Sequence, residues 1–169
     1  MSGSDCFMII IGIDPGETLI GFGIIKKDRQ KLSLVDCGCI KIDPDGNKKK
    51  PTAEKLLELE EKLSKIILRY KPELAGVESI FFSKNTKTAI NVAQARGVIL
   101  ATCQRNKIKI CEPTPLQVKQ AVAAYGRADK AQVQRMISLI LNMDTPIIQD
   151  DTADAIATAI YAAHNSLVF

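Results

Sequence analysis

The sequence predicts an α/β fold in which a mixed five-stranded sheet is flanked by helices. Three β-rich segments joined by short turns lie between Met8 and Ile42, and strand and helix patterns alternate after them. A meander followed by strand–helix alternation is typical of a mixed sheet covered by helices. The 169 residues, 46% hydrophobic and 25% charged, suit one domain over residues 1–169.

The expected strands follow from β-branched runs that end at turn residues. Met8–Ile13 is apolar without alternation, which predicts a strand covered on both faces. Asp14-Pro-Gly16 ends this strand. The other expected strands are Leu19–Ile25, Leu32–Ile42, Leu74–Ser79 and Lys107–Cys111.

The expected helices follow from apolar residues at helical spacing. After a loop at Asp43–Pro51, Thr52 is a plausible N-cap for a helix that Pro72 stops. A long helix is expected over Asn85–Arg105. Further helices are expected over Leu116–Tyr125, over Asp129–Leu141, and from Asp150 into the C-terminal region.

Composition excludes several classes of protein. The longest apolar run, Phe7–Ile11, is too short to span a bilayer and lacks the flanks of a signal peptide, so we expect a cytoplasmic protein. The five cysteines form no CxxC pair and His164 is the only histidine, which favours neither a disulfide framework nor a zinc site. A net charge of +4 is only mildly basic and says little about nucleic acid.

Four acidic residues stand in apolar surroundings, where carboxylates are costly unless paired or bound to metal. Asp14 ends the first strand and Glu78 follows Leu74-Ala-Gly-Val77. Asp151 and Asp154 are spaced i, i+3 on one face of the last helix. Side chains from two central strands and one helix can converge on one point, and hard divalent cations prefer such oxygen ligands.

Each of these acids also has a structural interpretation. Asp14 could be a turn residue, Glu78 a strand-end charge, and Asp150 or Asp151 an N-cap. Asp154 has no capping role at its depth in the helix. Asp150 and Asp154, at i, i+4, share a face as well, so spacing alone does not choose between Asp150 and Asp151.

Five motifs occur in the order seen in the RuvC family of Holliday-junction resolvases, which the chain resembles from about residue 8 to about residue 164. They are Gly12-Ile-Asp-Pro-Gly16, Val77-Glu78 with Phe81 shortly after, Gln94-Ala-Arg-Gly97, Gln117-Val-Lys-Gln120 and Asp151-Thr-Ala-Asp-Ala155. The resemblance implies a ribonuclease H-like fold and a homodimer that nicks two opposed strands of a four-way DNA junction. It also implies cooperation with the RuvA–RuvB branch-migration complex.

The resemblance assigns the catalytic and metal-binding acids to Asp14, Glu78, Asp151 and Asp154, and so favours Asp151 over Asp150. Two-metal hydrolysis of a phosphodiester needs such carboxylates, and we expect two Mg²⁺ per subunit, for which Mn²⁺ can substitute. By the same resemblance Lys119 and Lys130 lie near the scissile phosphates. Phe81 matches an aromatic residue at the DNA surface, where it could stack on an unpaired base.

The long helix carries two apolar stripes, which is typical of a helix covered on both sides. One stripe is Ile90, Ala93, Gly97, Leu100 and Ala101, and the other is Val92, Ala95, Ile99 and Cys103. Either the second stripe contacts a partner subunit or both stripes are buried within one domain.

Two rival functions are also compatible with the sequence. One is a ribonuclease H-like nuclease that processes RNA. The other is a junction-binding scaffold without catalysis, which the presence of all four acids disfavours. An actin-like ATPase, which opens with a turn similar to Gly12–Gly16, needs two such domains and does not fit 169 residues.

Overall fold

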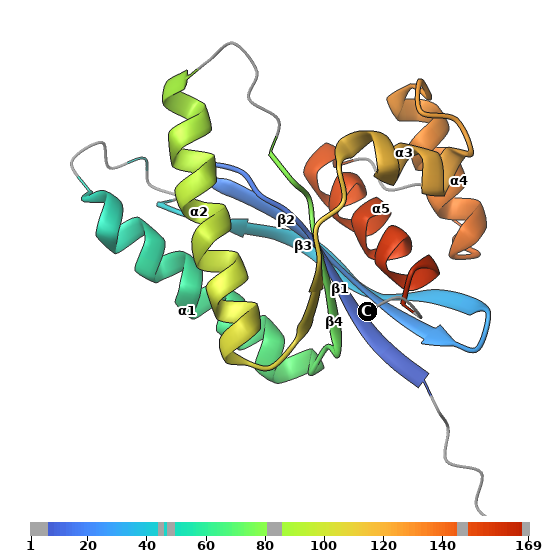
Figure 1. Ribbon diagram of the computed structural model, residues 1–169, viewed down its shortest axis with the longest axis horizontal. Helices are drawn as coiled ribbons and strands as arrows, with labels where there is room; N and C mark the ends of the chain where they lie inside the picture. Colours follow the sequence, from blue (N-terminus) through green and yellow to red (C-terminus); the bar gives the residue numbers. More distant parts are fainter. Residues whose placement is uncertain (1–6, 44–45, 47–49, 81–85, 145–148, 167–169) are drawn as a thin grey trace, which may run out of the picture.

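The computed structural model describes residues 7–43, 46, 50–80, 86–144 and 149–166. These residues form a five-stranded sheet in the order β3-β2-β1-β4-β5 (Figure 1). The strands are β1 (Phe7–Asp14), β2 (Leu19–Asp28), β3 (Lys31–Lys41), β4 (Leu74–Val77) and β5 (Lys109–Cys111). The first three pair antiparallel, β4 pairs parallel with β1, and β5 pairs parallel with β4. The predicted mixed sheet is confirmed.

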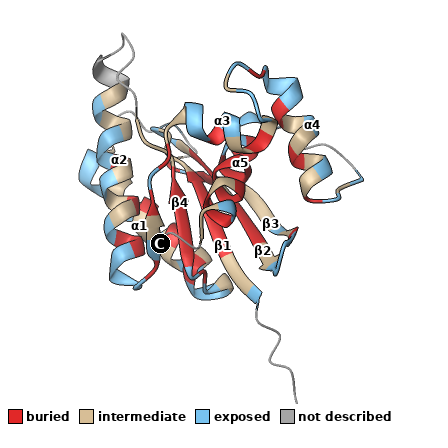
Figure 2. Cartoon of the chain, turned by 45° about the vertical axis from the view of Figure 1, so that its right-hand side comes forward, coloured by how far each residue is buried: buried red, intermediate tan, exposed pale blue. Residues whose placement is uncertain are grey.

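Two helical layers enclose the sheet, one on each face (Figure 1). The helices are α1 (Thr52–Tyr70), α2 (Thr86–Arg105), α3 (Pro115–Ala123), α4 (Lys130–Ile140) and α5 (Asp150–His164). Helices α1 and α2 share one hydrophobic core with one face of the sheet, and α3, α4 and α5 share the other core. The fully buried residues therefore lie in the sheet and on the inner sides of the helices, most of all along α5 (Figure 2).

Strand β1 is the centre of the molecule because it contributes side chains to both cores. Ile10 is buried against the α5 layer, whereas Ile11 and Ile13 are buried against α1 and α2. All three have no exposed surface. The expectation of a strand covered on both faces is confirmed.

Helices α1, α3 and α4 start at other residues than predicted, because of the residues that occupy their N-cap positions. Helix α1 has Pro51 rather than Thr52 as its N-cap, and no side chain caps it. Helix α3 starts at Pro115, because Thr114 and Gln117 form a capping box and proline suits the first helical position. Asp129, predicted as the start of α4, is its N-cap and forms the equivalent box with Gln132.

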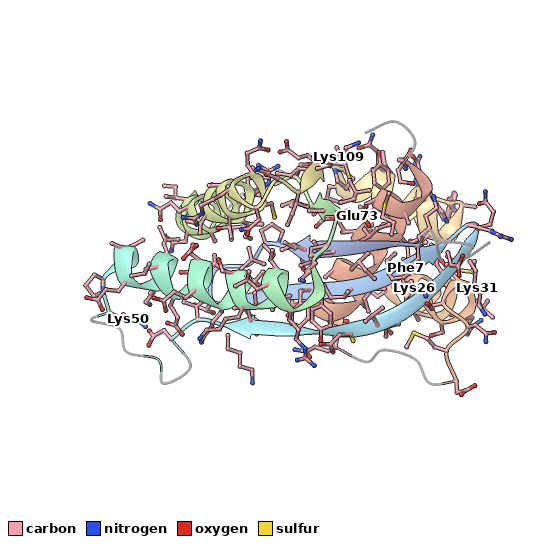
Figure 3. All side chains as sticks on the ribbon, turned by 90° about the horizontal axis from the view of Figure 1, so that it is seen from below. Phe7, Lys26, Lys31, Lys50, Glu73 and Lys109 are labelled. Carbon is pink, nitrogen blue, oxygen red and sulfur yellow. The ribbon has the colours of Figure 1, made fainter. Side chains whose placement is uncertain are left out.

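Two strands are shorter than predicted. Strand β5 begins at Lys109 rather than Lys107, because Lys107 has a left-handed backbone with a φ of 59°. The backbone N–H of Lys109 donates to the carbonyl of Glu73 (3.1 Å) where the parallel β4–β5 pair starts, and both residues are labelled in Figure 3. Strand β4 ends at Val77, so Glu78 follows the strand instead of lying within it.

The two apolar stripes of α2 have different surroundings, and the second stripe does not form the interface expected of it. Ala95, Ile99 and Cys103 are buried in the core between α2 and the sheet. Ile90, on the first stripe, is 58% exposed. The second stripe is therefore core and cannot contact a partner. The last helix cannot cover the first stripe either, because α5 packs on the opposite face of the sheet.

The composition also led to expectations about membrane spans and about the cysteines. Within the described ranges, none of the helices combines the length and the apolar character needed to cross a bilayer. Cys37, Cys39, Cys103 and Cys111 are free thiols, the first two half-buried and the last two buried. Near the start of β1, the Lys26 ammonium lies 4.2 Å from the centre of the Phe7 ring; both residues are labelled in Figure 3.

Candidate active site

Asp14 and Glu78 are brought together by the pairing of their strands. Strand β1 ends at Asp14, β4 runs parallel beside it, and Ile13 is in register with Val77. The backbone N–H of Glu78 donates to the carbonyl of Ile13 (3.2 Å), which extends the pairing by one bond. Both carboxylates therefore emerge at the carboxyl edge of the sheet, where α/β proteins place their ligands.

A row of glycines brings α5 against the same part of the sheet. Gly12 is in register with Gly23 on one side and with Gly76 on the other. A Cβ atom on Gly12 would lie 2.0 Å from the carbonyl oxygen of Ala155, far inside van der Waals contact. Because these strand positions have no side chain, the helix backbone lies directly on the strands.

A fourth glycine places the first turn of α5 beside Asp14. Gly21 is in register with Asp14, and a Cβ atom on Gly21 would lie 2.0 Å from the carbonyl oxygen of Asp151. Asp154 lies on the next turn of the helix and lines a cleft of about 170 Å³ together with Glu78. This close approach of α5 to the strand glycines was not predicted, although isolated glycines within strands are a sequence signal of it.

The predicted acids are close enough to act on one another electrostatically. Burial, followed by the charges of Asp154 and Asp151, raises the pKa of Asp14 to about 7, and Lys130 opposes the rise. Burial, followed by Asp14 and Asp154, raises the pKa of Glu78 to about 7, and Lys119 opposes it. The acids therefore form one electrostatic group with uncompensated negative charge.

Asp154 belongs to the same group although the residue as a whole is exposed. Desolvation of its carboxyl in the cleft raises its pKa, with further rises from Asp150 and Asp151. Lys130 and Lys119 lower it. Asp154 thus experiences both the acids and the two predicted DNA-binding lysines.

Lys119 and Lys130 line the cleft from two different helices, α3 and α4. The Lys130 ammonium donates to a carboxylate oxygen of Asp150 (2.8 Å), and the Gln134 amide donates to the other oxygen (3.4 Å). Asp150 is thus engaged with α4, whereas Asp151 is the acid whose charge reaches Asp14. Neither is an N-cap, because Gln149 takes that position.

The donor set has the chemistry of a divalent-cation site. Every candidate ligand is a carboxylate, and a cation would compensate the burial and the mutual repulsion that raise the pKa values of Asp14, Glu78 and Asp154. Among the described residues, no group of three or more His, Cys, Asp or Glu side chains could hold a metal ion as it stands. Mg²⁺ usually keeps several water ligands and binds through one or two carboxylates, so it does not need such a group.

Two further residues of interest in the sequence are Phe81 and His164. Phe81, the expected stacking residue, lies outside the described residues. His164 is the last residue of α5 and is not among the described residues that line the cleft.

Comparison with known proteins identifies relatives along nearly the whole chain. A family model described as crossover junction endodeoxyribonuclease RuvC matches residues 10–162. RuvC from Pelotomaculum thermopropionicum is 47% identical over 158 residues, which cover 94% of each chain. RuvC from Alkaliphilus metalliredigens is 44% identical over 158 residues with the same coverage.

Solved structures have the same fold. The structure titled "T. thermophilus RuvC in complex with Holliday junction substrate" superimposes with a TM-score of 0.85 at 30% identity, over 95% of this chain and 96% of that one. The yeast mitochondrial Holliday junction resolvase has a TM-score of 0.66 at 12% identity, which shows a shared fold alone. The predicted ribonuclease H-like sheet is therefore the fold of these resolvases, and this chain belongs to the RuvC family of crossover junction endodeoxyribonucleases.

Proposed function

We propose that this chain is a metal-dependent endonuclease that resolves four-way DNA junctions by paired nicks in opposed strands, in recombination and repair. The observation that carries the proposal is the convergence of carboxylates at one edge of the sheet in a chain of the RuvC family. Two cleft lysines beside those acids supply the positive charge that a phosphodiester substrate needs.

We assign the catalytic and metal-binding role to Asp14, Glu78, Asp151 and Asp154. They would hold two Mg²⁺, or Mn²⁺ in its place, and bound metal would activate water and neutralise the leaving 3′-oxygen. The residues of the chain hold the ligand oxygens at the sheet edge through strand pairing and the glycine contacts with α5. Asp14 and Asp154 each interact electrostatically with the other three acids of this group.

We exclude Asp150 from the catalytic set in favour of Asp151. The Asp150 carboxylate already accepts hydrogen bonds from Lys130 and Gln134 on α4. Asp151 has its backbone against Gly21, directly across from Asp14. This arrangement supports the assignment that the family motif implies.

Substrate contact is assigned to Lys119, Lys130 and Phe81. The two lysines lie beside the acids, where they can bind the phosphates next to the scissile bond. The role of Phe81 rests on the family resemblance, which implies that its ring stacks on an unpaired base at the crossover.

The functional unit is proposed to be a homodimer that uses the exposed stripe of α2. Ile90 is 58% exposed, and a Cβ atom on Gly97 would meet nothing within 4 Å. A mid-helix glycine destabilises a helix by about 1 kcal/mol relative to alanine. Because the chain itself does not need the space at Gly97, this glycine suits the close approach of a second subunit.

The proposed domain, cellular compartment and partner complex follow from membership of the RuvC family. Residues 1–169 would act as one nuclease domain in the cytoplasm, together with the RuvA–RuvB complex that moves the junction. Two identical sites related by two-fold symmetry suit a junction of near two-fold symmetry, since they face equivalent strands.

The test is to incubate purified protein with a four-way junction, the matching linear duplex and a structured RNA, with Mg²⁺ or with EDTA, and to map the nicks. We expect paired nicks in opposed strands of the junction only, and only with Mg²⁺. Preferential cleavage of RNA would instead identify an RNA-processing nuclease. Junction binding without cleavage in Mg²⁺ would identify a scaffold.

A further inference from the structure

The motif Gln94–Gly97 takes part in the resemblance, yet only its glycine has a role in the proposed function. Its arginine lies on α2 but is directed towards the end of β4. The Arg96 Nε–H donates to the main-chain carbonyl of Glu78 (3.1 Å). A second guanidinium nitrogen of Arg96 forms an ion pair with the Glu112 carboxylate, just after β5. One side chain thus joins α2 to the ends of two strands.

The bond from Arg96 completes the fixation of the main chain on both sides of the Glu78 Cα atom. On one side, the Glu78 N–H donates to the carbonyl of Ile13 (3.2 Å). On the other, the Ser79 N–H donates to the carbonyl of Pro113 (2.8 Å), and the Ser79 hydroxyl donates to the same oxygen (2.9 Å). Since both flanking peptide planes are held, the direction of the Glu78 Cα–Cβ bond is determined.

The Arg96 contact differs from the others because it comes from a side chain on a separate helix. The Arg96 side chain is only 18% exposed, and the planar guanidinium can donate in two directions at once. The Glu112 carboxylate balances the charge of Arg96 and orients it. The contacts of Arg96 are with the main-chain carbonyl of Glu78 and with the Glu112 carboxylate, so an effect of Arg96 on the site would pass through Glu78.

We propose that Arg96 is a positioning residue, which holds the main chain of Glu78 so that its carboxylate is presented to the metal ions, with Glu112 orienting Arg96. This inference rests on the proposed function, because it concerns the same site. Residues that orient metal ligands typically change metal affinity or activity by about 10–100-fold when they are replaced. The same magnitude is expected for Arg96.

The test compares wild type with Arg96→Gln in three measurements: Mn²⁺ affinity by calorimetry, junction binding in EDTA, and the single-turnover rate of nicking. For Arg96→Gln we expect Mn²⁺ affinity and rate to fall by about 10–100-fold, with junction binding in EDTA unchanged. Higher Mn²⁺ concentrations should restore part of the rate, which they would not do for an unfolded variant. Arg96→Lys keeps the charge but loses the planar fork, so it should restore little.

Arg105→Gln is the matched control, because Arg105 lies on the same helix and pairs with Glu60. It should leave all three measurements unchanged. Glu112→Gln provides a second variant that keeps Arg96, and it should weaken Mn²⁺ binding in the same direction but less.

Wild-type Mn²⁺ affinity and rate in a folded Arg96→Gln would overturn the inference. If circular dichroism shows that Arg96→Gln is unfolded, wild-type Mn²⁺ affinity in Glu112→Gln would overturn it instead. Failure of the wild-type protein to nick junctions would count against the proposed function, and the Mn²⁺ measurement would still test Arg96 separately.

Discussion

At the scale of single residues, the proposed chemistry of the site depends on Asp14. Its carboxyl is desolvated between β1 and α5, and it interacts with the charges of Asp154, Asp151 and Glu78. A buried carboxyl surrounded by other acids is unfavourable unless a cation or a proton compensates it. In the metal-free chain the ionised Asp14 carboxylate therefore destabilises the fold.

Asp14→Asn, Glu78→Gln and Asp154→Asn should each abolish nicking in Mg²⁺ while junction binding survives. The acids serve the chemical step, whereas affinity comes mainly from phosphate contacts elsewhere. Gel-shift and nicking assays on the same samples separate the two properties. Asp150→Asn is the control and should retain nicking; near-normal nicking by any of the other three variants would remove that residue from the site.

The stability of the metal-free protein should fall as pH rises through the range in which Asp14 ionises. Its pKa is raised from 3.8 to about 7, so the folded chain binds more protons than the unfolded chain between these values. The stabilisation is fully present below the lower value and is lost as pH rises through the higher one. Thermal melts in EDTA between about pH 5 and about pH 8 measure this dependence.

Asp14→Asn is the companion variant for the pH series. It should flatten the dependence and raise the melting temperature at the alkaline end. Mg²⁺ should also raise the wild-type melting temperature there, because it binds the folded chain in preference to the unfolded one. An identical pH dependence in Asp14→Asn would show that other groups are responsible.

At the scale of elements, the contact between α5 and the sheet decides whether the acids meet. Gly23, Gly12 and Gly76 lie side by side on β2, β1 and β4 beneath the helix. A side chain at any of them would meet backbone or Cβ atoms of α5 within 3.0 Å. The spacing of β1 and β4 from α5 is thus set by glycines, which have no reactive side chain.

Gly12→Ala should displace α5 and so reduce both stability and nicking. Overpacking of this kind costs about 1–3 kcal/mol, which corresponds to a fall in melting temperature of roughly 2–4 °C for each kcal/mol. Glu61→Ala is the control, because Glu61 is an exposed residue of α1 and lies outside the proposed site. If Gly12→Ala matched wild type in both melting and nicking, the close contact would not be needed for the site.

At the scale of the whole molecule, the sheet separates the proposed catalytic side from the proposed dimer side. Helices α3, α4 and α5 cover one face, and α1 and α2 cover the other (Figure 1). Glu78 lies at the edge where the two meet, and Arg96 joins its main chain to α2. A second subunit on the exposed stripe of α2 would therefore contact the helix that we propose positions Glu78.

Ile90→Lys should convert a dimer into a folded monomer, because Ile90 is 58% exposed. Ile99→Lys should instead unfold the chain, because Ile99 is fully buried and an unpaired charge there is very costly. Sedimentation gives the mass of each variant and circular dichroism gives its folding. A folded dimer with Ile90→Lys would place the interface elsewhere. The monomer should also lose paired nicking, since one site cannot reach two opposed strands.

The sequence by itself determined the order of strands and helices, because hydrophobic periodicity and turn residues are local signals. It also predicted a site at Asp14, Glu78, Asp151 and Asp154 from their apolar surroundings and their motifs, and this assignment stays a prediction. Helix spacing put Asp151 and Asp154 on one face, as a regular 3.6-residue repeat requires. Capping was less predictable: Thr52 resembles an N-cap, but Pro51 takes that place, since a preference for a residue type does not determine where the first turn begins.

Only the tertiary structure decided which partner each surface has. Periodicity shows that both stripes of α2 are apolar, but not that Ile99 faces the sheet while Ile90 faces outward, because burial depends on what the rest of the chain places there. The same holds for Asp150, whose partner Lys130 lies on another helix, and for Arg96, whose carbonyl partner lies beyond a strand. The raised pKa of Asp14 likewise arises from burial and from charges on α5, which become its neighbours only when the glycine row allows the helix to lie on the sheet.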